Sequence, residues 1–380
     1  MGMKFLRKHA VPLLFLVLCA LGAYWSGLMP ITLINEIIVR LSRNSFFVIS
    51  LIIPILAGMG LNFGIVLGAM AAQAGYVVTV NLGFEGLTGI LTTCIFAVPL
   101  AVLLGWMTGV LFNHAKGKEM ITSIILSFFA NGVYQFVFMI LAGWIIPMRA
   151  ANLLQVKTDG TPGIGLVNTV DLSQMKYGID NILKWNISMQ DIQSLTDFLG
   201  FSFQIPRTRP VSIPVGTFLL ILGLCILMHF LFKTKQGQDF RSVGHDMGIA
   251  ATSGIDVDRV RVSAIIFSTV FAAVGQVIFL QNLGNIQTYG SHVQVGTYAV
   301  ASLLIGGASV KKATVGQALL GTLLFHTLFI VSPLAGKNLL NDVQIGEYFR
   351  VCISYGVICV ALSLHAWQEK ERIRAEKASA

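Results

Sequence analysis

Long apolar runs separated by short polar stretches follow one another along almost the whole sequence. We expect spanning helices at 10–28, 46–62, 65–83, 88–112, 119–145, 212–232, 262–281, 297–310, 313–333 and 347–366. A helix needs about 20 mostly apolar residues to cross a bilayer, and most of these runs approach that length. The pattern predicts an all-α polytopic membrane protein with about ten transmembrane segments, some of them short or broken by glycine, in a single domain over residues 1–380.

The composition excludes the two other broad classes. Of the 380 residues, 55% are hydrophobic and 11% are charged, whereas a soluble globular protein carries about 25% charged residues. A disordered chain would need few apolar residues and much charge. A membrane protein is therefore the class that remains.

The basic residues indicate orientation rather than a nucleic-acid partner. The net charge is +9, but the positive side chains cluster in short loops, which are typically cytoplasmic. With a cytoplasmic N-terminus the inner clusters are Lys4/Arg7/Lys8, Lys116/Lys118, the run from Lys233 to Arg261, Lys311/Lys312 and Lys370/Arg372/Arg374/Lys377. Both termini are then expected in the cytoplasm. Arg40 and Arg43 fall on the outer side of the membrane in this orientation and do not fit the rule that basic residues are cytoplasmic. They flank an amphipathic run, Ile31–Leu41, that we expect along the outer interface.

Two polar segments stand out between the predicted helices. Residues 147–211 form a long insertion that we expect in the periplasm, too small and too weakly apolar for an independent catalytic domain. Residues 233–261 form a cytoplasmic loop. Within it, Ala250 and Ala251 with Gly254 behind them predict a short helix that ends on a glycine cap. Such a helix suits insertion into a groove of another protein, although an inert connector has the same composition.

Enzyme motifs are missing from the sequence. It contains no HExxH, GxSxG, CxxC or GxxxxGK[ST] pattern. The five cysteines lie in apolar runs without metal-ligand spacing. We therefore expect no catalytic residue, no metal and no cofactor in this chain. Glu85 and His326 are the residues that an ion-coupled mechanism would use.

Polar residues inside the apolar runs are the candidate pathway groups. Ser123, Ser127, Asn131 and Gln135 recur at every fourth position and share one face of a helix. Lipid would penalise that stripe, so it faces a partner helix or a polar pathway. Hydrogen bonding between helices and a lining for a hydroxyl-rich solute both explain it. Two more candidates, Asn62 and Gln73, lie in a glycine-rich stretch of the first half.

Several segments resemble the permease subunit of bacterial ATP-binding-cassette importers, of the ribose, simple-sugar and nucleoside type. The similar segments are Gly244 to Ile255, Ala301 to Ser309 with Gly316 and Gly321, and Asn81-Leu82-Gly83-Phe84-Glu85-Gly86, which is similar to the nucleoside branch. The resemblance implies that residues 244–255 are a coupling helix that enters the ATPase subunit. Its candidate contact residues are Gly244, His245, Asp246, Ile249, Ala250, Ala251, Ser253 and Gly254.

The resemblance also implies partners and a location. The partners are ATPase subunits that hold ATP and magnesium, a second permease that is identical or paralogous, and a periplasmic or lipid-anchored solute-binding protein. The location is the bacterial inner membrane. The solute is expected to be a simple sugar or nucleoside, with riboflavin-like compounds and amino acids as alternatives. An ion-coupled transporter acting alone, or a scaffold without transport, are the other classes.

Overall fold

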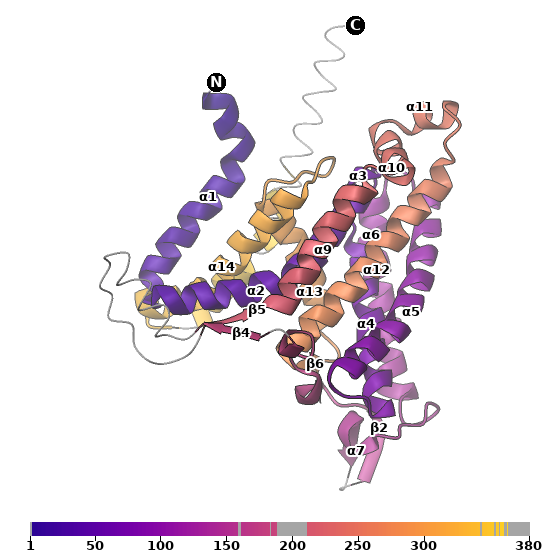
Figure 1. The fold of residues 1–380 in the computed structure, drawn as a ribbon, viewed down its shortest axis with the longest axis vertical. Helices are drawn as coiled ribbons and strands as arrows, with labels where there is room; N and C mark the ends of the chain where they lie inside the picture. The colour runs from indigo at the N-terminus through magenta and orange to yellow at the C-terminus, as the bar shows by residue number, and fades with distance from the viewer. Residues whose placement is uncertain are drawn as a thin grey trace, which may run out of the picture.

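The computed structural model describes residues 2–158, 161–182, 184–187, 211–342, 344–352, 355–356, 358–360 and 363. Its long helices are α1 (Gly2–Ser26), α2 (Pro30–Ser50), α4 (Val66–Leu82), α5 (Gly86–His114), α6 (Glu119–Phe136), α9 (Val215–Leu231), α12 (Val257–Leu283), α13 (Ser291–Ile305) and α14 (Val315–Leu340). Helices α4, α5 and α12 pack together on one side, α1 packs against α14 on the other, and α2 runs across between them in contact with α12 and α14 (Figure 1). The prediction of an all-α membrane protein is confirmed for this part of the chain.

Fewer helices qualify as spans than the sequence predicts. Within the described residues, six stretches are long and apolar enough to cross a membrane: Pro30–Leu56, Phe63–Leu82, Gly86–His114, Glu119–Leu141, Val257–Leu283 and Val315–Leu339. A seventh results if α9 and α10 (Lys235–His245), which are bent by 72°, count as one span. The apolar part of α1 is only Val11–Ser26, and α13 has 15 residues. The expected last span at 347–366 lies partly outside the described residues.

The start of the second span differs from the prediction. The run Ile31–Leu41 does not form a separate segment before a span at 46–62. It belongs to α2, a single helix over Pro30–Ser50 that continues almost directly into α3 (Ile52–Leu56). Proline at the first helical position starts α2, and no glycine or proline interrupts it. The chain leaves the helix only at Gly58 and Gly60, whose φ angles of +77° and +71° are unfavourable for other residues.

Helix α12 lies at the centre of the bundle and contacts α2, α4 and α5. Small residues allow the close approach. A side chain at Gly68 of α4 would lie 2.5 Å from the carbonyl oxygen of Thr269, and one at Gly109 of α5 would lie 2.8 Å from Cα of Val262. Close backbone contact through small residues is typical of membrane helices, because no hydrophobic effect drives their association within lipid.

The two ends of the bundle carry different structures (Figure 1). The N-terminal end of α1 lies at the same end as α11 (Met247–Thr252). The opposite end carries α7 (Ala151–Leu154) and short antiparallel strand pairs, which are β1 (Gln155–Thr158) with β2 (Thr161–Leu166), β3 (Thr169–Asp171) with β6 (Asn285–Gln287), and β4 (Lys184–Ile187) with β5 (Val211–Pro214). These strands belong mainly to the 147–211 insertion. Its residues 188–210 lie outside the described part.

The insertion is fastened to the helices rather than folded apart from them. Strand β3 pairs with β6, which directly follows α12. The buried carboxylate of Asp180 accepts hydrogen bonds from the backbone nitrogen and the hydroxyl of Thr217 at the start of α9, both at 2.8 Å. Asn81 at the end of α4 accepts from the backbone nitrogens of Arg149 and Ala150, at 2.6 and 3.2 Å. The segment similar to the nucleoside branch therefore anchors the insertion.

Candidate functional site

A buried polar cluster joins three helices in the interior of the bundle. Gln73 of α4 donates through Nε2 to Oγ of Ser291 at 2.5 Å, and its Oε1 accepts from the hydroxyl of Tyr134 at 2.8 Å. His292 of α13 bridges α4 and α6. Its Nδ1 lies 2.9 Å from Oε1 of Gln73, and its Nε2 lies 2.8 Å from Oδ1 of Asn131 in α6. Gln73 and His292 are fully buried. The structure thus brings two predicted pathway residues into one network.

The hydrogen bonds restrict the proton positions on His292. Oε1 of Gln73 can only accept, so Nδ1 of the histidine carries a proton when that bond forms. Nε2 faces Oδ1 of Asn131, and the role of Nε2 depends on the orientation of the Asn131 amide. The Asn131 side chain is only partly buried.

Two serines of the stripe on α6 bind the turn that connects the stretches Pro30–Leu56 and Phe63–Leu82. Between α3 and the short 3-10 turn Phe63–Ile65 the backbone is not helical, and Asn62 caps that 3-10 turn by accepting from the backbone nitrogen of Gly64 at 2.8 Å. Ser123 accepts from the backbone nitrogen of Phe63 at 3.2 Å, and Ser127 donates to the carbonyl oxygen of Phe63 at 2.7 Å. Buried backbone groups outside a regular helix need hydrogen-bond partners from neighbouring groups, and the two serines supply them here.

The other predicted pathway residues are less connected. Nδ2 of Asn62 is buried and has no hydrogen-bond partner in the described residues. Gln135 is partly exposed and forms no hydrogen bond with any residue that the structure describes. It lies just before a π-helical turn, Val137–Leu141, a local distortion that is frequent at functional sites.

The predicted short helix near residue 250 is α11. Asp246 caps it by accepting from the backbone nitrogens of Gly248 and Ile249, at 2.7 and 3.0 Å. It ends before Gly254, whose φ of +81° is the left-handed cap expected from the sequence. Ala250 is buried, whereas the exposed residues of the predicted block are Gly244, His245, Asp246, Ile249, Ala251, Ser253 and Gly254. Gly244 packs against the end of α3.

A buried ion pair links α11 to the stripe. The Arg261 side chain of α12 is fully buried, and its Nη2 lies 2.5 Å from Oε1 of Glu119, the first residue of α6. The same guanidinium donates to Oδ1 of Asn113 at 2.9 Å and to Sδ of Met247 in α11 at 3.3 Å. One arginine therefore contacts α5, α6 and α11 together.

The sequence did not identify the partners in these networks. His292 follows Gly290 at the end of an apolar run and resembles a loop residue, and Tyr134 is one of many aromatic residues. Arg261 was recognisable as a charge near the start of an apolar helix, which is uncommon. Within the described residues, no group of three or more histidine, cysteine or acidic side chains could hold a metal ion.

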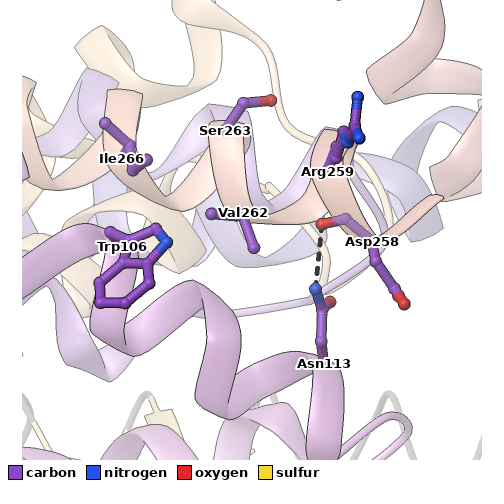
Figure 2. A pocket seen from close by; sticks show the side chains of 7 residues that line it. All are labelled: Trp106, Asn113, Asp258, Arg259, Val262, Ser263 and Ile266. Atoms are coloured by element: carbon purple, nitrogen blue, oxygen red, sulfur yellow. Dashed lines mark hydrogen bonds between the residues drawn. The ribbon is translucent and has the colours of Figure 1, made fainter. Parts of the chain in front are cut away.

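A cavity of about 400 Å³ lies between α5 and α12 and shares Asn113 with the Arg261 network (Figure 2). Trp106, Val262, Ser263 and Ile266 line one part, and Asn113 donates to the carbonyl oxygen of Asp258 at 2.9 Å across the other. No predicted pathway residue lines this cavity. Its apolar, open wall on the outside of α5 is typical of a lipid-facing groove.

Comparison with known proteins shows distant relatives among importers. The ribose import permease protein RbsC of Escherichia coli K12 is 20% identical over 360 residues, which cover 94% of this chain and 92% of that protein. RbsC of Bacillus subtilis is 27% identical over 169 residues, 43% of this chain and 49% of that protein. The autoinducer 2 import system permease protein LsrC of Yersinia pestis Pestoides F is 24% identical over 254 residues, 65% of this chain and 56% of that protein.

No solved structure gives a significant match to this chain. The sequence profile of one family, described as the branched-chain amino acid transport system / permease component, matches residues 33–362. That range contains the polar cluster, the turn at Asn62, α11 and the Arg261–Glu119 pair. This protein therefore belongs to the branched-chain amino acid transport system / permease component family, a family of transporter permeases that are not themselves catalytic.

Proposed function

We propose that this chain is the permease subunit of an ATP-driven importer that passes a simple sugar or a nucleoside from a solute-binding protein into the cytoplasm. The observation that carries this proposal is the buried cluster of Gln73, Asn131 and His292. These are uncharged groups with which a hydroxyl-rich solute can form and break hydrogen bonds one after another. A pathway needs contacts that are favourable but weak, so that the solute can leave.

The pathway in this proposal is lined by Asn62, Gln73, Ser123, Ser127, Asn131 and Gln135, with His292 as an additional member. Ser123 and Ser127 act mainly by holding the turn at Phe63 in place.

The energy would come from partner ATPase subunits. Helix α11 presents Ile249 and Ala251 outward and is joined through Met247 and Arg261 to α6, which carries Asn131. Movement of α11 with a closing ATPase would therefore reach the pathway through packed groups. A partner shifts the equilibrium between two conformations of the permease only if it contacts them differently. The exposed face of α11 is where the ATPase would make that contact.

Uptake by the assembled transporter tests this proposal. The permease, the ATPase and the solute-binding protein encoded beside it would be reconstituted in vesicles, and uptake of labelled ribose and adenosine measured with and without ATP. We expect ATP-dependent uptake that falls at least about tenfold in Asn131→Leu, a loss of about 1.4 kcal/mol in the transport step. Thr92→Val is the matched control, because that hydroxyl donates only to its own helix at Thr88.

Uptake that proceeds without the ATPase would instead identify an ion-coupled transporter acting alone. In that case replacement of Glu85 or His326 would abolish transport. Equal uptake by Asn131→Leu and Thr92→Val would indicate that the polar stripe on α6 serves only in helix packing.

A further inference from the structure

Arg40 and Arg43, the two charges that do not fit the expected orientation, point to a site of their own. Both lie on α2 and are only partly exposed. The Cζ atom of Arg43 lies 5.5 Å from the ring centre of Phe279 in α12, and that of Arg40 lies 5.1 Å from the ring centre of Phe329 in α14. The guanidinium groups are thus held against aromatic rings inside the helix packing.

The charges in this group are not balanced. Arg40 lies 3.8 Å from Oε2 of Glu36 one turn earlier on α2. For Arg43, no carboxylate of the described chain lies within ion-pair distance, and its Nε has no hydrogen-bond partner there. His326 of α14 is 5% exposed, and its Nδ1 is likewise unpartnered among the described residues. Polar groups left unpaired in the interior are costly, and charged ones more so.

These side chains surround a cavity of about 170 Å³ between α2, α12, α13 and α14. Arg40, Arg43 and His326 line it, together with Asn44, Gln294 and Ser291. Ser291 also accepts the hydrogen bond from Gln73. The cavity is therefore adjacent to the polar cluster that we propose as the pathway.

We propose that this cavity binds an anionic oxygen group, a carboxylate or a phosphate, carried by the transported solute. The planar guanidinium groups match such groups with paired hydrogen bonds. Ring contacts alone compensate a buried cation only partly, so Arg43 has a place for an anionic partner. The inference rests on the proposed function and narrows its solute to an acidic sugar or a phosphorylated sugar. A lipid phosphate has the same chemistry, and the apolar side chains of Phe279, Leu283 and Val295 also line the cavity. The amides of Asn44 and Gln294 favour a sugar, and anionic lipid in the nanodisc tests the alternative.

Ligand-dependent stability of the purified permease in neutral-lipid nanodiscs tests this site. The probes are ribose 5-phosphate, glucuronate, ribose and inorganic phosphate, with sodium chloride at matched ionic strength. We expect ribose 5-phosphate or glucuronate to raise the unfolding midpoint by about 2–4 °C, ribose and inorganic phosphate to raise it less, and Arg43→Gln to abolish the shift. Arg259→Gln is the control, since that arginine is exposed and pairs with Asp256 at 2.9 Å. If Arg43→Gln does not fold, Arg43→Lys serves in its place, because it keeps the positive charge. We expect a smaller increase in the unfolding midpoint with Arg43→Lys than with the wild type.

Several results would overturn the inference. The first is an unfolding midpoint that neither acidic sugar raises more than sodium chloride does, and the second is an increase that persists in Arg43→Gln. The third is an equal increase with inorganic phosphate. The fourth is an increase that anionic lipid in the nanodisc produces by itself, so that the acidic sugars add nothing to it. Uptake by the assembled transporter separates this failure from failure of the proposed function. If only the inference is wrong, ribose accumulates equally with wild type and Arg43→Gln. If the proposed function is wrong, no solute accumulates with ATP in either.

Discussion

His292 connects groups that would otherwise be unpaired in the interior. It bonds to Gln73 and Asn131, and its ring lies 4.7 Å from that of Tyr134. Removing a shared partner costs more than one hydrogen bond, because each remaining buried group keeps its full desolvation penalty. At the scale of single residues, the proposed pathway and the stability of the fold therefore share one side chain.

Replacement of His292 by phenylalanine keeps the ring and removes both hydrogen bonds. We expect a loss of about 1–3 kcal/mol for each unpaired group, seen as a lower midpoint of thermal unfolding in detergent. His229→Phe is the control, because His229 is exposed on α9 and its ring contacts Phe230. An unchanged midpoint for His292→Phe would contradict the network as described.

Replacing the Arg261–Glu119 pair is expected to change stability in a different pattern. Arg261→Met leaves Glu119 buried without its cation, which costs about 3–5 kcal/mol, whereas replacing both partners with apolar residues can be nearly neutral. We expect Arg261→Met to unfold at a much lower temperature than the double variant Arg261→Met/Glu119→Leu. A double variant no more stable than the single one would exclude a net cost from the unpaired carboxylate.

Between elements, α10 and α3 meet backbone to backbone. A side chain at Gly58 would lie 2.9 Å from Cα of Gly244, and one at Gly244 would overlap the carbonyl oxygen of Leu56. Gly58 lies in the turn between the stretches Pro30–Leu56 and Phe63–Leu82, so the helix before α11 touches this turn directly. Close contact of this kind transmits displacement because packed interiors have little free space.

Gly244→Ala should force α10 away from α3. We expect lower ATP-dependent uptake with the permease still in the membrane, measured with the reconstituted transporter. Gly223→Ala in α9 is the matched control, since a methyl group there meets no atom within 4 Å. Equal uptake by the two variants would mean that α3 and α10 move independently.

Helix α11 provides the test of ATPase docking. Ala251 is exposed beside the buried Ala250, so Ala251→Arg adds bulk and charge to the outer face without disturbing the inner one. We expect the ATPase to be lost from affinity-purified permease while the amount of permease in the membrane is unchanged. Gln238→Arg adds the same side chain to an exposed position of α10 and should retain the ATPase. Normal recovery of the ATPase with Ala251→Arg would exclude α11 as the docking element.

For the whole molecule, the two ends of the bundle predict its orientation. The end with α11 carries Lys116, Arg259 and neighbouring basic residues, whereas the other end carries the strands of the insertion. Cytoplasmic loops are enriched in lysine and arginine. We therefore expect α11 in the cytoplasm and strand β3 outside.

Cysteine labelling tests that orientation. In intact cells treated with a membrane-impermeant maleimide, Thr169→Cys in β3 should react and Ala251→Cys in α11 should react only after the membrane is opened. Both positions are exposed in the structure. The reverse pattern would invert the topology and remove α11 from the compartment where ATP is hydrolysed.

The sequence alone determined the class of protein, the helices, the polar stripe on α6 and the short glycine-capped helix α11, because each depends on composition or on local periodicity. It predicts about ten spans, whereas the described residues contain six stretches that are long and apolar enough to cross a membrane, or seven with the bent pair of α9 and α10. Apolar length does not show that α13 stays short. Only the tertiary structure decided which polar groups meet. Gln73 and His292 are 219 residues apart, and Glu119 and Arg261 are 142 apart. Partners so distant are selected by the packing of whole helices, where every buried polar group needs a partner and no local pattern records which one it has.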